Sequence, residues 1–149
     1  MAHIVHLHGT HVVRIVIDPG SEVSFVTSHV VDILALKRVH LSVPVSGIGG
    51  CHSAHNRGKM TIALKSMHRD LTVQFSADIL NKISSAVPSM PCNESQWSHF
   101  DGLQLADSSF GQPRHVDVLI GADVYPSIIK PNIIYGSSDE SMAQLSIFG

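Results

Sequence analysis

Residues 12–27, VVRIVIDPGSEVSFVT, carry the most informative pattern in this chain. An apolar run ends on a single acid, Asp18, the chain turns at Pro19-Gly20, and an apolar segment follows. An Asp before Pro-Gly is most often a turn residue. Its place at the end of an apolar strand leaves a second interpretation open, in which the Asp18 carboxylate takes part in chemistry.

Composition and charge predict one compact domain over residues 1–149. The chain is 44% hydrophobic and 15% charged, and its net charge is −2 with the histidines neutral, which is typical of a domain with its own core. No overall basic field is present to attract nucleic acid. No segment approaches the roughly 18 apolar residues that span a bilayer, and the N-terminus does not resemble a targeting signal. We therefore expect a soluble domain with neither nucleic acid nor membrane as a partner.

Cysteine and histidine usage gives weaker signals. Cys51 and Cys92 are too few for a disulfide framework, which favours a reducing compartment. Cys51, His52 and His55 have a spacing that metal ligands use, but no second pair of ligands completes a site. We expect no metal and no cofactor. Protonation of the eleven histidines would make the net charge positive, so acid should weaken a dimer by repulsion.

Short strands and turns dominate the first part of the chain. The apolar segments on either side of residues 8–11, HGTH, predict a hairpin, with Gly9 free to take the positive φ of a tight connection. In residues 27–37, TSHVVDILALK, the apolar spacing predicts a helix of about 8 to 10 residues. Thr27 or Ser28 is the expected cap.

The middle of the chain predicts further strands. Residues 41–50, LSVPVSGIGG, indicate an edge strand, because of Pro44, that runs into a Gly-rich tip, and residues 58–66 indicate the strand that returns from it. Residues 70–80, DLTVQFSADIL, alternate as a half-buried strand does. Residues 88–115 have no such pattern and predict a long irregular insertion.

Residues 116–130, VDVLIGADVYPSIIK, predict a fully apolar strand, a Gly turn and a short helix. Asp123 is the expected N-cap of that helix. Asp107 is expected to cap or brace the insertion. Trp97 is expected to fill a gap between the insertion and the sheet.

The chemistry available to Asp18 depends on a second acid. Two carboxylates brought together share a proton, so that one acts as a base toward water and the other as an acid toward the substrate. The other Asp close before a Gly, Asp101, follows no apolar strand. A dyad therefore requires a second chain, in a homodimer with the active site on its two-fold axis.

Five strings of this sequence occur in an order that resembles the retropepsin-like aspartic peptidase domain in the polyproteins of animal BEL/Pao-type LTR retrotransposons. They are VRIVIDPGSEVSFVT, VPVSGIGG, LQLADSSF, VDVLIGADVY and AQLSIFG, and together they reach from about Val12 to Gly149. The resemblance implies a mainly β fold, a retropepsin-like acid-protease half-barrel with a flap hairpin and one or two short helices, assembled as a homodimer. It also implies a cytoplasmic setting, which includes retroelement particles.

The resemblance assigns roles to the residues of the opening stretch. It implies that Asp18 is the catalytic acid and that the Gly20 amide supports its carboxylate. It implies that Ser21 and Glu22 hydrogen-bond the substrate backbone beside Gly20. Residues 118–121, VLIG, would cross behind this loop and brace it.

A second group of expected substrate-binding residues lies in the Gly-rich tip. The resemblance implies that residues 46–50, SGIGG, fold as a flap over an extended peptide. Ile48 would form its tip, between Gly47 and Gly49. Glycines suit a lid that moves and lets one backbone approach another.

One residue departs from the pattern of the family. The position of Pro19 usually holds Ser or Thr, whose hydroxyl and amide exchange hydrogen bonds with the partner chain beneath the two acids, and proline has neither donor. Pro19 either weakens the dimer or stiffens the turn through its fixed φ. Two functions follow as hypotheses: an aspartic endopeptidase that cleaves a retroelement polyprotein by dyad-activated attack of water, and a catalytically silent domain retained for peptide binding or dimerisation. A His-rich metal-binding protein is a third hypothesis, which rests on the histidines alone.

Overall fold

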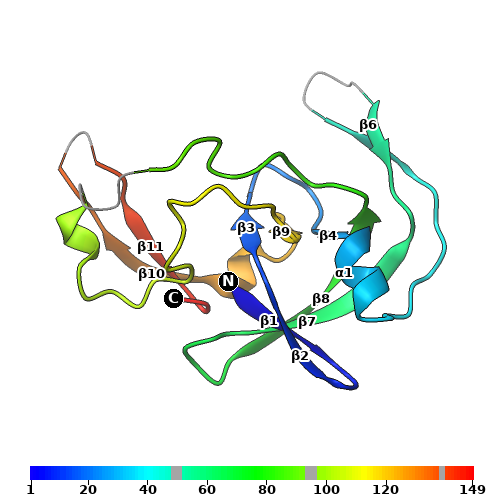
Figure 1. The fold of residues 1–149 in the computed structure, drawn as a ribbon, viewed down its shortest axis with the longest axis horizontal. Helices are drawn as coiled ribbons and strands as arrows, with labels where there is room; N and C mark the ends of the chain where they lie inside the picture. Colours follow the sequence, from blue (N-terminus) through cyan, green and yellow to red (C-terminus); the bar gives the residue numbers. More distant parts are fainter. Residues whose placement is uncertain (48–51, 93–96, 138–139) are drawn as a thin grey trace.

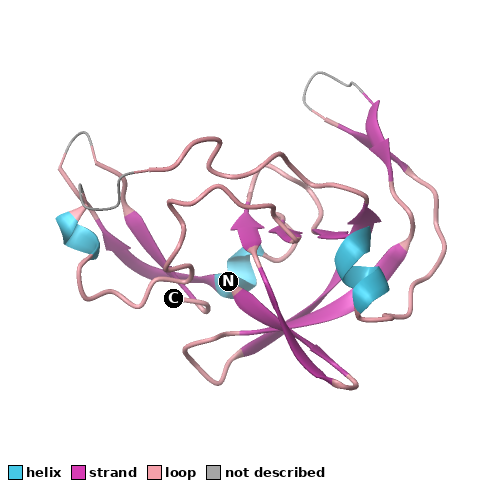
Figure 2. Ribbon diagram, viewed as in Figure 1, coloured by secondary structure: helices cyan, strands magenta, loops and turns pink. Residues whose placement is uncertain are grey.

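The computed structural model describes residues 1–47, 52–92, 97–137 and 140–149. The protein is mainly β, as expected, and its helices are short (Figure 2). Neither α-helix in the described part of the chain has the length and apolar character needed to cross a bilayer. The main sheet contains β1 (Ala2–His6), β2 (Gly9–Val13), β3 (Ile15–Ile17), β4 (Phe25–Thr27), β7 (Lys59–Lys65), β8 (Thr72–Leu80) and β9 (Val118–Ile120).

The main sheet curls into a nearly closed barrel. Its seven strands lie in the order β2-β1-β7-β8-β4-β9-β3. The strands at the two ends of that order, β2 and β3, follow each other in the chain with only Arg14 between them. The sheet therefore wraps round until its ends meet at Arg14 (Figure 1). One continuous apolar cluster forms the core; its members include Ile4, Leu64, Ile79, Ile120 and Phe148.

The N-terminal hairpin is confirmed, and the helix after β4 is shorter than expected. β1 and β2 pair antiparallel around Gly9, whose φ is 135°. Helix α1 (Ser28–Ile33) has six residues, because Ala35 adopts a φ of 47° and breaks the helical path. Thr27 is the N-cap residue, but its side chain makes no capping hydrogen bond. Its Oγ1 atom is buried without a partner among the described residues.

The strand that returns from the Gly-rich tip was assigned to the wrong residues. β5 (Pro44–Ser46) pairs with β6 (His52–His55) in a separate two-stranded sheet, where both strands are edges and Pro44 is tolerated. Residues 58–66 instead supply β7 of the barrel. The buried Asn56 lies between β6 and β7. Its side chain accepts a hydrogen bond from the Val43 amide at 3.0 Å and donates one to Asp78 at 3.0 Å.

The predicted strand over residues 70–80 is confirmed as β8. Its exposed Gln74 and Ser76 alternate with buried Phe75 and Ala77. The insertion (residues 88–115) is irregular in its described part, apart from the 3-10 helix η2 (Ser98–Phe100) and a single bridge to Val87.

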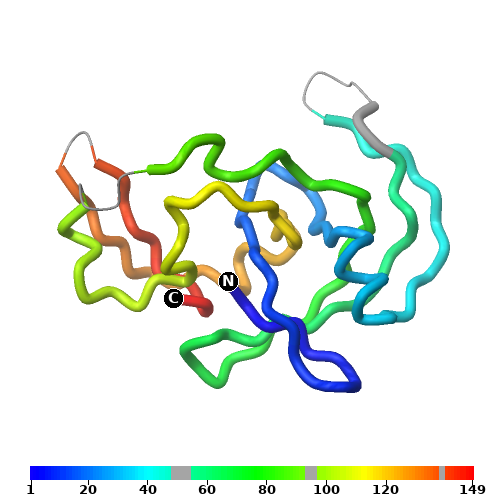
Figure 3. Tube along the Cα trace, in the orientation of Figure 1, coloured from blue at the N-terminus to red at the C-terminus, as the bar shows by residue number. Residues whose placement is uncertain are grey.

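The C-terminal region forms a second two-stranded unit. α2 (Tyr125–Ile128), the expected short helix, follows β9 and leads into β10 (Ile129–Ile134), which pairs with β11 (Ala143–Ser146). Figure 3 shows the described parts of the insertion extending from the barrel out to this β10–β11 ribbon and returning toward the barrel. The Met1 ammonium donates to the Ala106 carbonyl at 2.7 Å, so the N-terminus lies against the insertion. Burial lowers the pKa of this ammonium.

Candidate functional site

Asp18 stands directly after β3, in the Asp18 loop (residues 18–24). Its amide donates to the Ile120 carbonyl of β9 at 2.9 Å, which extends the parallel β3–β9 pairing to the carboxylate itself. The Gly20 amide donates to Asp18 Oδ1 at 3.0 Å and the Ser21 hydroxyl to Oδ2 at 2.8 Å. Both carboxylate oxygens are thus oriented by the loop, and no Lys or Arg of the described ranges forms an ion pair with Asp18.

The Asp18 loop begins with a tight turn that accommodates proline. The Ser21 amide donates to the Asp18 carbonyl at 3.1 Å, which closes a four-residue turn. Pro19 occupies its second position, where the fixed φ of proline is suited. The Pro19 ring is exposed. Pro19, the residue that departs from the family's pattern, is therefore compatible with the backbone conformation of this turn.

Residues 120–123 brace the loop from behind. The Ala122 amide donates to the Ser21 carbonyl at 2.8 Å, and the Gly121 amide donates to the Ser24 hydroxyl at 3.0 Å. A Cβ on Gly121 would lie 2.6 Å from the Val23 carbonyl oxygen. Only glycine lets the two backbones come this close.

Asp123 has a different role from the one expected. The N-cap of α2 is Val124, and no side chain caps it. Asp123 Oδ1 instead accepts from the Ser24 hydroxyl at 2.7 Å, and Oδ2 accepts from the Ser24 amide at 3.3 Å. Since Ser24 is fully buried, Asp123 holds the far end of the Asp18 loop and not the helix.

The remaining predicted site residues are less tied to Asp18. Glu22 lies in the same loop and is exposed. Gly47 is exposed at the end of β5, while Ile48 and Gly49 lie outside the described residues. In Figure 1 the β5–β6 hairpin projects from the body on the side toward which β3 points. The structure therefore brings Asp18, Gly20 and Ser21 into one hydrogen-bonded group, with Glu22 beside it.

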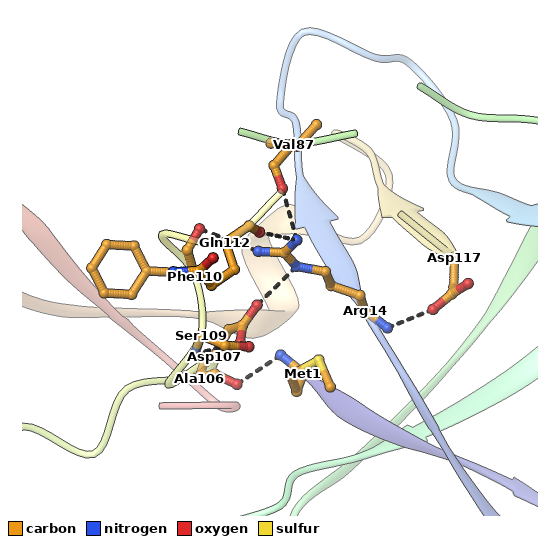
Figure 4. Close-up of polar contacts among 9 residues, drawn as sticks. All are labelled: Met1, Arg14, Val87, Ala106, Asp107, Ser109, Phe110, Gln112 and Asp117. Carbon is orange, nitrogen blue, oxygen red and sulfur yellow. Dashed lines mark hydrogen bonds and ion pairs between the residues drawn. The ribbon is translucent and has the colours of Figure 1, made fainter. Parts of the chain in front are cut away.

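Arg14 is the residue that sequence analysis missed. It is 8% exposed, and its guanidinium reaches into the insertion (Figure 4). Nε donates to Asp107 Oδ2 at 2.8 Å. The other nitrogens donate to the carbonyls of Val87 at 2.7 Å, Gln112 at 3.0 Å and Phe110 at 3.2 Å. Arg14 is the one charged residue within the otherwise apolar VVRIVI of residues 12–17, and this was the available signal, because a buried charge requires a partner.

Asp107 completes this network and braces the insertion, as predicted. Its Oδ1 accepts from the amide and the hydroxyl of Ser109, both at 2.9 Å. Burial by itself would raise the pKa of Asp107, but the Ser109 hydrogen bonds and the Arg14 charge outweigh it and hold that pKa below its usual value. Asp107 is therefore a structural anion. Trp97, expected against the sheet, stacks on Phe110 of the insertion with 5.3 Å between ring centroids.

Metal ligands and known proteins give no further assignment. Over the described ranges, no three His, Cys, Asp or Glu side chains are grouped as a metal would need; Cys51 and the His52 side chain lie outside those ranges. No protein-family model, no curated protein and no solved structure matches this chain. The function is therefore inferred from the chain's own residues and geometry.

Proposed function

We propose that this chain is a retropepsin-like aspartic endopeptidase that acts as a homodimer on an extended polyprotein segment. The observation that supports the proposal most directly is the orientation of the Asp18 carboxylate. Each of its oxygens accepts a hydrogen bond from the Asp18 loop. Such bonds fix the direction of the carboxylate, and Asp18 is only half-buried. The resemblance of the five sequence strings to retropepsin-like domains supports the same function.

The reaction needs one Asp18 from each chain. Two carboxylates that meet on a two-fold axis share one proton, because both cannot ionise cheaply. The ionised Asp18 takes a proton from water, and the water oxygen attacks the peptide carbonyl carbon while the protonated Asp18 donates to the carbonyl oxygen. The tetrahedral intermediate then breaks its C–N bond: the Asp18 that took the proton from water gives it to the departing nitrogen, and the other Asp18 takes a proton back from a hydroxyl of the intermediate. No covalent enzyme intermediate forms.

The loop and the hairpin have separate roles in this proposal. Gly20 and Ser21 keep the Asp18 oxygens aimed at the water, since each donates to one oxygen. Glu22 and Gly47 are exposed and available to the backbone of an extended peptide. The β5–β6 hairpin covers the peptide as a flap in this proposal.

Pro19 favours a second candidate, a catalytically silent module for peptide binding or dimerisation. The position that would grip the partner chain beneath the two acids has no hydroxyl and no amide proton. Two missing hydrogen bonds of this kind cost about 1–3 kcal/mol each if their partners stay buried. A dimer weakened by this amount keeps its fold and loses turnover.

A cleavage assay separates the two candidates. The wild-type chain, Asp18→Asn and the matched control Asp101→Asn are incubated with a peptide library at about pH 5, and products are identified by mass spectrometry. Asp101 is exposed and also precedes a glycine, so the control makes the same chemical change outside the loop. We expect cleavage by the wild type and Asp101→Asn and none by Asp18→Asn. Equal cleavage by all three, or cleavage by none, would contradict the peptidase.

A further inference from the structure

A cavity of about 570 Å³ lies between the insertion and the β10–β11 ribbon. Its wall is mainly apolar, with Phe100, Leu105 and Phe110 from the insertion and Ile134 and Leu145 from the ribbon. No residue of the Asp18 loop lines it. Its volume is in the range of sites that enclose small molecules.

Within the described ranges, Arg69 is the one lysine or arginine that lines this cavity, and a hydrogen bond holds its backbone there. Arg69 lines the cavity from the β7–β8 turn, and its amide donates to the Ser66 hydroxyl at 3.2 Å. The neighbouring His68 ring donates through Nε2 to the Leu105 carbonyl at 3.0 Å, which joins the turn to the insertion wall. Across the part of the chain that the structure describes, the Arg69 guanidinium has no ion pair.

Two other polar side chains of the wall, those of Asp107 and Gln144, already have partners. Asp107 forms an ion pair with Arg14 and accepts from Ser109, so its negative charge is already compensated. The Gln144 amide nitrogen donates to the carbonyls of Lys130 and Asn132 within the ribbon. Arg69 is thus left as the group that can recognise a charged ligand.

We propose that this cavity binds a medium-chain aliphatic carboxylate, whose chain lies between Leu105 and Ile134 and whose carboxylate pairs with Arg69. An apolar wall favours the hydrocarbon chain through burial, and a guanidinium matches the two oxygens of a carboxylate. A neutral aliphatic ligand would use the wall and leave Arg69 without a partner. The site is independent of Asp18, so the proposal stands apart from the peptidase activity.

The test measures binding of decanoate and of neutral decanol by displacement of a fluorescent dansyl-undecanoic acid probe. Arg69→Gln removes the charge at an exposed position and should not impair folding. The matched control is Arg57→Gln, at an exposed arginine between β6 and β7. Ala143→Phe places a ring in the cavity, since Ala143 lines it. Asp18→Asn tests the independence from the Asp18 loop.

We expect saturable binding of the probe to the wild type, Arg57→Gln and Asp18→Asn, and none to Ala143→Phe. Arg69→Gln should weaken decanoate about tenfold, the loss expected for one charge-assisted contact at a partly exposed site, with decanol unchanged. An absence of saturable binding to the wild type would overturn the proposal. Equal decanoate affinity for Arg69→Gln and Arg57→Gln would also overturn it. Loss of bound probe as the protein self-associates would overturn it as well, because a second copy of the chain would then cover the cavity.

Discussion

Arg14, where the two ends of the main sheet meet, and Asp107 of the insertion form a buried ion pair, with Nε and Oδ2 2.8 Å apart although 93 positions separate the residues. The side chains are 10% and 14% exposed. Arg14 is also the single residue between β2 and β3, the two ends of the main sheet. The pair therefore attaches the insertion to the place where the barrel closes.

Arg14→Met should lower the free energy of unfolding by about 3–5 kcal/mol, the usual effect of removing one partner of a buried ion pair. Asp107 would remain in its buried site without its counter-charge. Urea denaturation followed by circular dichroism measures the change. The matched control is Lys65→Met, since Lys65 and Asp70 are also 2.8 Å apart but are 42% and 95% exposed. The control should leave the urea midpoint nearly unchanged, and equal midpoints for the two variants would contradict the role of burial.

The same pair gives a prediction for acid. The pKa of Asp107 is lower in the folded chain than its ordinary value of 3.8. The stability that its charge contributes is therefore complete above that value and is lost as the pH falls through the folded pKa. The difference in unfolding free energy between the wild type and Asp107→Asn should be constant above about pH 5 and shrink below about pH 4. Urea titrations across this range test it, and a difference that grows in acid would contradict the sign.

The features predicted correctly depend on neighbours along the chain. Alternation alone located β8, and Gly9 located the first hairpin. The errors depend on distant partners: Asp123 was assigned to α2, but its partner Ser24 lies 99 positions away. Arg14 was passed over because its acceptors belong to an insertion without periodicity. The Asp18 turn itself was predictable, since Asp-Pro-Gly carries its own turn chemistry.

Gly121→Ala tests the brace behind the Asp18 loop. Its new Cβ would lie 2.6–2.8 Å from backbone atoms of Val23 and Ser21, which have no side-chain freedom to move aside. We expect a loss of about 1–3 kcal/mol in unfolding free energy, typical of overpacking, together with loss of peptide cleavage. Gly102→Ala is the control, because nothing lies within 4 Å of its Cβ and only its φ of 79° is unfavourable. Gly102→Ala should lower the free energy of unfolding by about 1 kcal/mol and retain cleavage. Full cleavage activity of Gly121→Ala would show that the contact between Gly121 and the Asp18 loop is not needed for the reaction.

Pro19→Ser separates the two possible roles of this proline. The exposed ring fits the second position of the turn closed by Ser21, so its loss should slightly destabilise the monomer, by about 0.4–1 kcal/mol, through greater freedom of the unfolded chain. The serine supplies a hydroxyl and an amide proton that a partner chain can accept. If the dimer lacks these bonds, its Kd should fall about tenfold or more in sedimentation equilibrium, and peptide cleavage should rise with the dimer fraction. An unchanged Kd with a less stable monomer would show that Pro19 serves the turn alone.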